Sequence, residues 1–171
     1  MTDQPTPLRR VLVVCTHNRT RSVMAGGLLW SYLRDDPSWV VDTAGFDVPG
    51  QPAIPEALQF LAAHGIDASA HRSRAITTEL VQSSVLVLTA ERQQVMRVVT
   101  EFGGNFDTTF TLPEFAQQVS RGGERPTGLA YLRADIPDVE DPTGRTHGVW
   151  ESVWRDLDVW CRTIATALHG H

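Results

Sequence analysis

The chain alternates short apolar runs with longer segments of helical spacing, and this alternation limits the folds available to it. The apolar runs are rich in β-branched residues, which favours buried strands, and they occupy residues 11–15, 39–45, 83–91 and 106–112. Between and after them, apolar residues recur at helical spacing in residues 22–33, 55–66, 91–102, 112–120 and 149–168. Strands that alternate with helices predict an α/β fold whose parallel sheet is covered on both faces.

Length and composition agree with one globular domain. With 171 residues, 42% of them hydrophobic, the chain is long enough for a sizeable core. We expect a single domain over residues 9–171, after a loose arm over residues 1–8. A formal charge of -5 and the lack of a basic run argue against a nucleic-acid partner. No apolar stretch approaches the ~18 residues of a membrane span, and the N-terminal residues lack the apolar core of a signal peptide. The expected location is therefore the cytoplasm, without membrane contact.

The first predicted strand ends at Cys15, and a short polar loop then leads to Arg21 at the start of a helix. Ligands of parallel sheets bind at the carboxyl ends of strands, where the N–H groups of the next helix point outward. Such a loop can wrap its N–H groups around one tetrahedral oxyanion, while the Arg21 guanidinium binds two of its oxygens. Cys15 would lie beneath the anion, where the same positive groups favour the nucleophilic thiolate. Ser22 is placed to donate a hydrogen bond to that thiolate, and Asn18 tolerates the left-handed backbone of a tight loop.

The two cysteines have different expected roles. They lie far apart in the sequence, so reduced thiols are expected rather than a disulfide. A buried, inert cysteine is the ordinary interpretation of Cys15 taken alone, but the neighbouring Arg21 and Ser22 argue against it. Cys161 lies beside Trp160 on the last predicted helix, and we expect it to pack in the core.

The segment CTHNRTRS resembles the C-x5-R-S loop of the low-molecular-weight protein tyrosine phosphatases. Further segments that match this family in order and spacing are DTAG at 42–45, HRSR at 71–74, VLVLTAE at 85–91 and DP at 141–142. The resemblance covers about residues 9 to 168. It implies a three-layer sandwich with a four-stranded parallel sheet and helices on both faces, and a cysteine-dependent phosphomonoesterase that cleaves phosphotyrosine through a phosphocysteine intermediate. No metal or other cofactor is expected, because the arginine and the N–H groups supply the charge stabilisation that a metal would give.

The catalytic roles implied by this resemblance fall on three residues. Cys15 attacks phosphorus, Arg21 binds the phosphate oxygens, and Asp141 protonates the leaving oxygen and later activates water. Asp141 precedes a proline, which restricts its backbone to extended conformations. The nearby Asp138 and Glu140 are expected on a solvated surface loop.

The resemblance also implies a set of supporting residues. Thr43 and His71 are expected under the cysteine loop, hydrogen-bonded to Asn18, so that the loop N–H groups point inward. His71 taken alone is equally well read as a satisfied buried histidine, which would also support the loop. The loop residues expected to bind the substrate are Thr16, His17, Arg19 and Thr20.

Three of these loop positions depart from the family pattern. His17 replaces the usual glycine, which has more backbone freedom. Thr20 replaces a second cysteine, so reversible protection of Cys15 against peroxide is expected to be lost. Arg19 stands where a small or apolar residue is common. A cation there is expected to repel phosphoarginine and to favour an acidic or doubly charged substrate.

The segment after the general acid also differs. No tyrosine directly follows Asp141, whereas many relatives place tyrosines there to line an aromatic slot. This absence weakens the case for phosphotyrosine. Phe46 and Trp150 are the candidates for a replacement aromatic wall, although core positions are expected for both.

Two other functions stay open. Arsenate reductases share the scaffold and often carry His-Asn where this loop reads CTHN; without a further cysteine pair, such an enzyme would need a low-molecular-weight thiol. The Asp-Pro segment favours phosphatase chemistry, because arsenate transfer to a thiol has less need of leaving-group protonation. A non-catalytic phosphate-binding module would result if His17 and Arg19 narrowed the pocket. The expected partner is a phosphorylated protein or a small phosphomonoester, and the oligomeric state is open.

Overall fold

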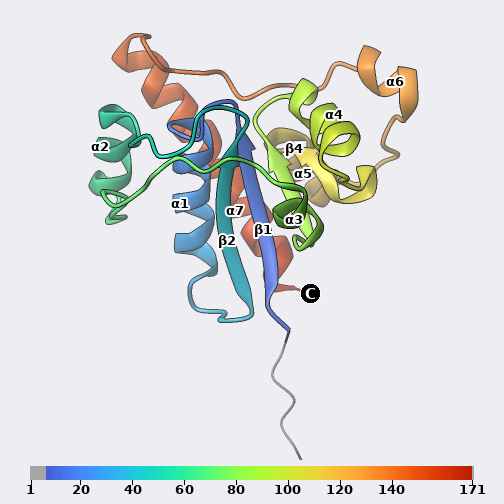
Figure 1. Ribbon diagram of the computed structural model, residues 1–171, viewed down its shortest axis with the longest axis horizontal. Coiled ribbons are helices and arrows are strands. Elements are labelled where there is room, and N and C mark those ends of the chain that lie inside the picture. Colours follow the sequence, from blue (N-terminus) through green and yellow to red (C-terminus); the bar gives the residue numbers. More distant parts are fainter. Residues whose placement is uncertain (1–6, 171) are drawn as a thin grey trace, which may run out of the picture.

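The computed structural model describes residues 7–170 and consists of a parallel sheet between two layers of helices (Figure 1). The sheet has four strands in the order β2-β1-β3-β4, and each neighbouring pair is parallel. The strands are β1 (Arg9–Cys15), β2 (Trp39–Gly45), β3 (Leu86–Thr89) and β4 (Thr109–Thr111). The predicted three-layer α/β fold is therefore confirmed. The arm predicted over residues 1–8 lies mostly outside the described residues.

Helices cover both faces of the sheet. They are α1 (Arg21–Leu33), α2 (Pro55–Ala63), α3 (Thr78–Gln82), α4 (Arg92–Glu101), α5 (Leu112–Arg121), α6 (Gly128–Arg133) and α7 (His147–His169), with a 3-10 turn at Phe106–Thr108. Side chains of β1 alternate between the faces, as the strand pleat requires. Val11 and Val13 face the core shared with α1, α2, α5 and α7, whereas Leu12 and Val14 face α3 and α4.

Two helices were not expected from the sequence. Helix α3 has five residues and α6 has six, so neither is long enough to display a helical repeat of apolar residues. The predicted loop over residues 122–128 is correct up to Gly128, where α6 begins. Helix α7 buries most of its expected apolar stripe, but Trp160 stays partly exposed.

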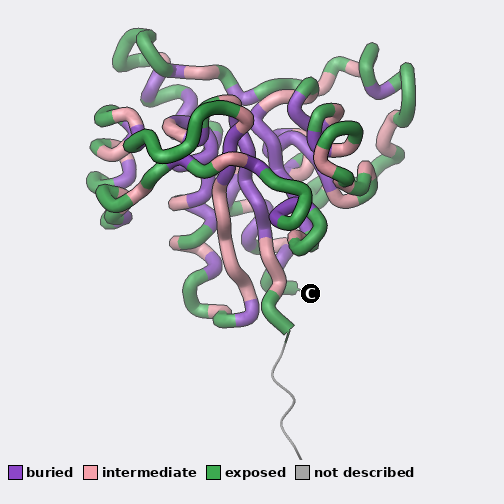
Figure 2. The backbone as a smooth tube through the Cα atoms, in the orientation of Figure 1, coloured by how far each residue is buried: buried purple, intermediate pink, exposed green. Residues whose placement is uncertain are grey.

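Strands β1 and β2 are most buried toward their carboxyl ends, where Cys15 lies. Figure 2 shows that β1 is buried along most of its length, whereas the edge strand β2 becomes buried only at its carboxyl end. At that edge of the sheet, Cys15 pairs with Gly45, and Val14 pairs with Thr89 of β3. The loops that follow these three strands therefore meet around Cys15.

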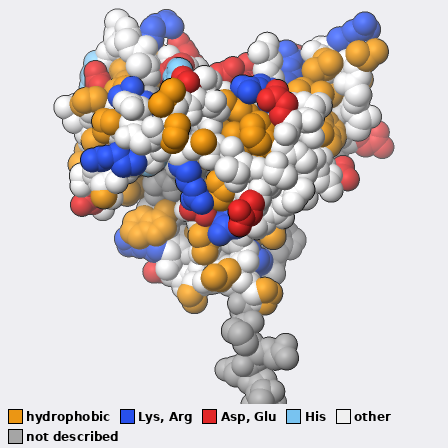
Figure 3. All heavy atoms as spheres, in the orientation of Figure 1, with side chains coloured by type: hydrophobic (Ala, Val, Ile, Leu, Met, Phe, Trp, Pro, Cys, Tyr) orange, Lys and Arg blue, Asp and Glu red, His pale blue; other side chains and the backbone are white. Residues whose placement is uncertain are grey.

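The surface carries charges of both signs. Figure 3 shows acidic and basic side chains interspersed over the face that it presents. Within the described residues, no helix is both long and apolar enough to cross a membrane.

Candidate active site

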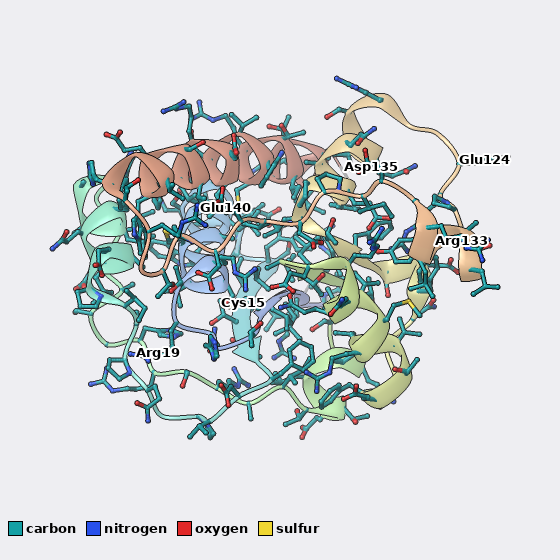
Figure 4. The ribbon with its side chains drawn as sticks, turned by 90° about the horizontal axis from the view of Figure 1, so that it is seen from above. Cys15, Arg19, Glu124, Arg133, Asp135 and Glu140 are labelled. Atoms are coloured by element: carbon teal, nitrogen blue, oxygen red, sulfur yellow. The ribbon has the colours of Figure 1, made fainter. Side chains whose placement is uncertain are left out.

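The cysteine loop joins β1 to α1 at the carboxyl edge of the sheet. Figure 4 looks down on this edge, with Cys15 near the centre and Arg19 on the side of α2. Cys15 is 3% exposed, at the floor of the loop. Asn18 has φ of 53°, and it is the only residue other than glycine with a positive φ between residues 7 and 170. Asn18 therefore adopts the left-handed backbone conformation that the sequence predicted for it.

A chain of hydrogen bonds leads from the loop to the sulfur. The N–H of Arg74 donates to Asn18 Oδ1 at 2.9 Å, which fixes the orientation of the amide. Asn18 Nδ2 then donates to Ser22 Oγ at 2.9 Å, and Ser22 Oγ lies 3.0 Å from Cys15 Sγ. The Cys15 thiol donates to Ser22 Oγ, which therefore accepts two hydrogen bonds. Once the sulfur is a thiolate, the Ser22 hydroxyl can turn its own proton toward it.

His71 supports the loop as expected, but Thr43 acts differently. His71 Nε2 lies 2.8 Å from the carbonyl oxygen of Asn18; since a carbonyl only accepts, this nitrogen carries the proton. In the described part of the chain, no hydrogen bond joins Thr43 to Asn18, so the expected bond is not found. Thr43 instead packs against α1, where a Cβ on Gly26 would lie 2.5 Å from its methyl carbon. It helps to set the distance between α1 and β2.

Residues outside the loop hold its first turn. The N–H of Phe46 donates to the carbonyl of Thr16 at 2.8 Å, and Gln94 Nε2 donates to the Thr16 hydroxyl at 3.0 Å. The chain passes so close at Gly45 that a Cβ there would lie 2.8 Å from Asn18 N and 2.9 Å from the Thr16 carbonyl oxygen. Only glycine fits this approach without a shift of the loop.

Arg21 is fixed by partners that the sequence did not suggest. Its side chain is 6% exposed, and its NH1 donates to Glu91 Oε1 at 2.7 Å and to the carbonyl oxygen of Val139 at 3.0 Å. NH2 lies 3.8 Å from Asp141 Oδ2. Glu91 follows β3, the neighbour of β1 in the sheet, which brings it next to the cysteine loop. The sequence feature that could have pointed to Glu91 is its position at the end of a predicted strand, the same feature that pointed to Cys15.

The loop with the predicted general acid lies over the guanidinium. Asp141 Oδ1 accepts a hydrogen bond from the N–H of Thr143 at 3.1 Å, while its other oxygen faces Arg21. The Asp141 side chain is 41% exposed, so water and substrate can reach it. The Val139 N–H donates to the carbonyl of Ala90 at 2.7 Å, which ties this loop to the end of β3.

The two neighbouring acids lie on the surface, as expected. Glu140 pairs with Arg145 at 3.3 Å, and both are more than half exposed. Asp138 is exposed too, but its Oδ1 accepts the N–H of Arg92 at 2.7 Å, at the start of α4. Asp138 therefore also anchors the loop that contains Asp141 to the start of α4.

A pocket of about 360 Å³ opens at the mouth of the site. Its lining consists of His17, Arg19, Thr20, Ile54, Asp141 and Thr143. Neither His17 nor Arg19 folds inward over Cys15, because each is held by a partner outside the loop. His17 Nδ1 lies 2.7 Å from Asp47 Oδ2, and the N–H of Val48 together with His17 lowers the pKa of Asp47. Arg19 Nε donates to the carbonyl of Pro52 at 2.7 Å.

Among the described residues, no phenylalanine, tyrosine or tryptophan lines this mouth. Trp150 is 3% exposed and stacks on Phe60, with ring centroids 6.1 Å apart. Phe46 packs against Phe102 at 5.8 Å and under the guanidinium of Arg97 at 4.1 Å. The core position expected for Trp150 is thus confirmed, whereas Phe46 is only partly buried at the edge of the core; neither lines the mouth or replaces the missing aromatic slot.

Comparison with known proteins identifies the family. The model described as low molecular weight phosphotyrosine protein phosphatase matches residues 10–171. The chain belongs to this family. The resemblance drawn from the cysteine loop is confirmed, and the protein is a hydrolase of the low-molecular-weight phosphatase type.

Proteins with different named activities are similar to the chain. A probable low molecular weight protein-tyrosine-phosphatase, EpsP of Ralstonia nicotianae, is 35% identical over 64% of the chain and 74% of its own length. A protein-arginine-phosphatase of Bacillus subtilis is 31% identical over 92% and 95%. An arsenate reductase of Staphylococcus aureus is 36% identical over 47% and 59%. The solved YwlE arginine phosphatase from Geobacillus stearothermophilus is 28% identical, with a TM-score of 0.77 over 95% of the chain and 94% of its own.

Proposed function

We propose that this protein hydrolyses phosphomonoesters through a phosphocysteine intermediate on Cys15. The observation that carries the proposal is the 3.0 Å hydrogen bond between Cys15 Sγ and Ser22 Oγ. Asn18 holds this serine in place, and its hydroxyl, which accepts from the thiol, can donate to the thiolate. A hydrogen bond to the charged form favours that form. Such a contact stabilises a thiolate both before it attacks and when it leaves.

The reaction needs two displacements at phosphorus. In the first, the Cys15 thiolate forms a bond to phosphorus as the ester oxygen leaves with a proton from Asp141. In the second, Asp141 takes a proton from water, the water oxygen attacks phosphorus, and Cys15 leaves as a thiolate held by Ser22. The Arg21 guanidinium and the loop N–H groups bind the phosphate oxygens throughout. Thr16, His17, Arg19 and Thr20 supply the loop around the phosphate and its mouth.

We propose aryl phosphates of the phosphotyrosine type as the substrates, rather than phosphoarginine. A phosphoarginine would bring its own guanidinium to a mouth that already contains Arg19. Like charges placed together at a binding surface cost several kcal/mol. A phosphotyrosine ring carries no charge and avoids this repulsion. The described lining of the mouth offers no phenylalanine, tyrosine or tryptophan that could stack on such a ring.

The arsenate reductase alternative is supported by the relative with that activity. Reduction of arsenate to arsenite takes two electrons, which two thiols supply as they form a disulfide. Cys161 is unsuitable as the second of these thiols. It is 0% exposed, its Sγ lies 3.6 Å from the Ala25 carbonyl, and burial raises the pKa of its thiol. An arsenate reductase built on this chain would therefore depend on an external thiol. A non-catalytic binding module is disfavoured, since His17 and Arg19 are held away from Cys15 and leave a mouth of about 360 Å³.

Steady-state hydrolysis of p-nitrophenyl phosphate in the presence of EDTA tests the proposal. We expect turnover that vanadate inhibits, that Cys15→Ser abolishes and that Asp141→Ala reduces strongly. Cys161→Ser is the matched control, because it removes the other thiol without touching the site, and it should retain activity. Absence of turnover in the unmodified protein, or full activity in Cys15→Ser, would refute the proposal. Arsenate with a low-molecular-weight thiol is the assay to run in that case.

A further inference from the structure

Arg19 is a fixed guanidinium with free hydrogen-bond donors. Its side-chain Nε donates to the carbonyl of Pro52 at 2.7 Å, and its own carbonyl accepts the N–H of Ile54 at 2.9 Å. The residue is half-buried. Over residues 7–170, neither of its terminal nitrogens has a hydrogen-bond or carboxylate partner, whereas Arg21 in the same loop meets both Glu91 and Asp141.

This arrangement suits the binding of a carboxylate. Two terminal N–H groups of a guanidinium form a planar fork that matches the two oxygens of a carboxylate. The bond to Pro52 already restricts the Arg19 side chain, so less rotamer freedom is lost when an anion binds. The effective dielectric constant near a protein surface is lower than that of bulk water, so such an ion pair is stronger there than between free ions.

The location of Arg19 links this fork to the substrate. Arg19 and Asp141 line the same mouth pocket, and Figure 4 shows Arg19 to one side of Cys15, toward α2. A group bound at Arg19 would therefore lie beside the phosphate rather than on it. Within the described lining of the mouth, Arg19 is the side chain with a permanent positive charge, so an acidic group of the substrate has one favourable position, beside its guanidinium.

We infer that Arg19 forms an anion subsite that binds the carboxylate of an acidic residue adjacent to phosphotyrosine in a polypeptide substrate. The inference rests on the proposed function, because it concerns the substrate of the same site. The protein has a formal charge of -5, so its overall field disfavours acidic peptides. A preference for them must come from a local contact.

Matched phosphotyrosine peptides test the subsite. Each pair differs only by Glu or Gln, placed directly before or directly after the phosphotyrosine, and kcat/KM is measured for each. A charge-assisted fork predicts that the unmodified enzyme prefers Glu at one of the two positions by about tenfold. In Arg19→Gln this Glu-to-Gln ratio should fall to near one. Arg145→Gln is the matched control: it removes the same charge from an exposed arginine outside the mouth lining, and the ratio should persist.

A binding measurement separates this inference from the proposed function. The same peptides are titrated against Cys15→Ser and against Cys15→Ser combined with Arg19→Gln, which needs no turnover. A preference for Glu that disappears only with Arg19 supports the subsite, even if hydrolysis fails. Equal affinity for the Glu and Gln peptides, or an equal loss of preference in Arg145→Gln, would overturn it. Hydrolysis without any Glu preference would leave the phosphatase proposal intact and refute the subsite.

Discussion

Removal of Glu91 should disable Arg21, the arginine that we propose binds the phosphate. Glu91 Oε1 accepts from Arg21 NH1 at 2.7 Å, and the guanidinium is 6% exposed. In Glu91→Ala, the guanidinium keeps the carbonyl of Val139 at 3.0 Å and the distant carboxylate of Asp141 at 3.8 Å. Neither contact alone orients both of its terminal nitrogens toward an oxyanion.

The size of the effect follows from the burial of the pair. Breaking a fully buried ion pair costs roughly 3–5 kcal/mol, whereas exposed pairs are worth about 1 kcal/mol or less. The Glu91 side chain is 32% exposed and Arg21 keeps one acceptor, so we expect a loss of about 2 kcal/mol in the free energy of unfolding. A guanidinium displaced by about 1 Å costs on the order of 100-fold in rate. We therefore expect kcat/KM to fall between about tenfold and 100-fold.

Urea unfolding and kcat/KM on an aryl phosphate measure the two effects. Glu91→Gln keeps a hydrogen-bond acceptor and should lose less than Glu91→Ala in both. The matched control is Glu101→Ala, which breaks an exposed pair with Arg97 at 3.0 Å and should cost at most about 0.5 kcal/mol with no loss of activity. If kcat/KM of Glu91→Ala stays within about twofold of the unmodified enzyme, as that of Glu101→Ala should, then Glu91 does not position Arg21.

Three further predictions concern the acid, the loop and the thiols. Asp141→Asn should lower the rate of phosphoryl transfer to Cys15, read from kcat/KM, by about 100-fold for an alkyl phosphate and much less for p-nitrophenyl phosphate, because the better leaving group needs no proton; equal losses of kcat/KM on both substrates would contradict a general acid, whereas kcat should fall on both because water attack lacks its base. Gly45→Ala should destabilise the fold by roughly 1–3 kcal/mol in urea and weaken vanadate binding, since the added carbon meets Asn18 N at 2.8 Å; unchanged stability and affinity would show that the loop adapts. Iodoacetamide at neutral pH should modify Cys15 and spare Cys161, whose pKa is raised by burial, as peptide mass mapping can check; faster labelling of Cys161 would contradict the assignment.

The fold was predictable because its long elements carry their own pattern. Strand β1 and helix α7 are continuous in the sequence, so a buried run and an apolar stripe are visible without any knowledge of the partners. Helices α3 and α6 were missed because about one and a half turns cannot display a repeat. The order of the strands depends on contacts between segments far apart in the chain, which local patterns do not contain.

In the candidate site too, residues that are close in the sequence were predictable, whereas contacts between distant segments were not. Cys15, Asn18 and Ser22 lie within one short segment, and the structure brings them together by the local geometry of a strand, a loop and a helix. Glu91 was missed because its contact with Arg21 spans 70 positions in the sequence and exists only when β3 lies beside β1. The expected bond from Thr43 fails for a related reason, since the direction of its side chain depends on how α1 packs on β2.

The mass of the enzyme during turnover shows directly whether phosphate passes through Cys15. Asp141→Ala is mixed with p-nitrophenyl phosphate, quenched in acid within the first turnover and analysed intact and after digestion. Slow hydrolysis without the base should let the intermediate accumulate, so we expect one added phosphoryl group, located on Cys15 and absent from Cys15→Ser. A phosphoryl group on another residue, or hydrolysis without any covalent adduct, would contradict the central claim.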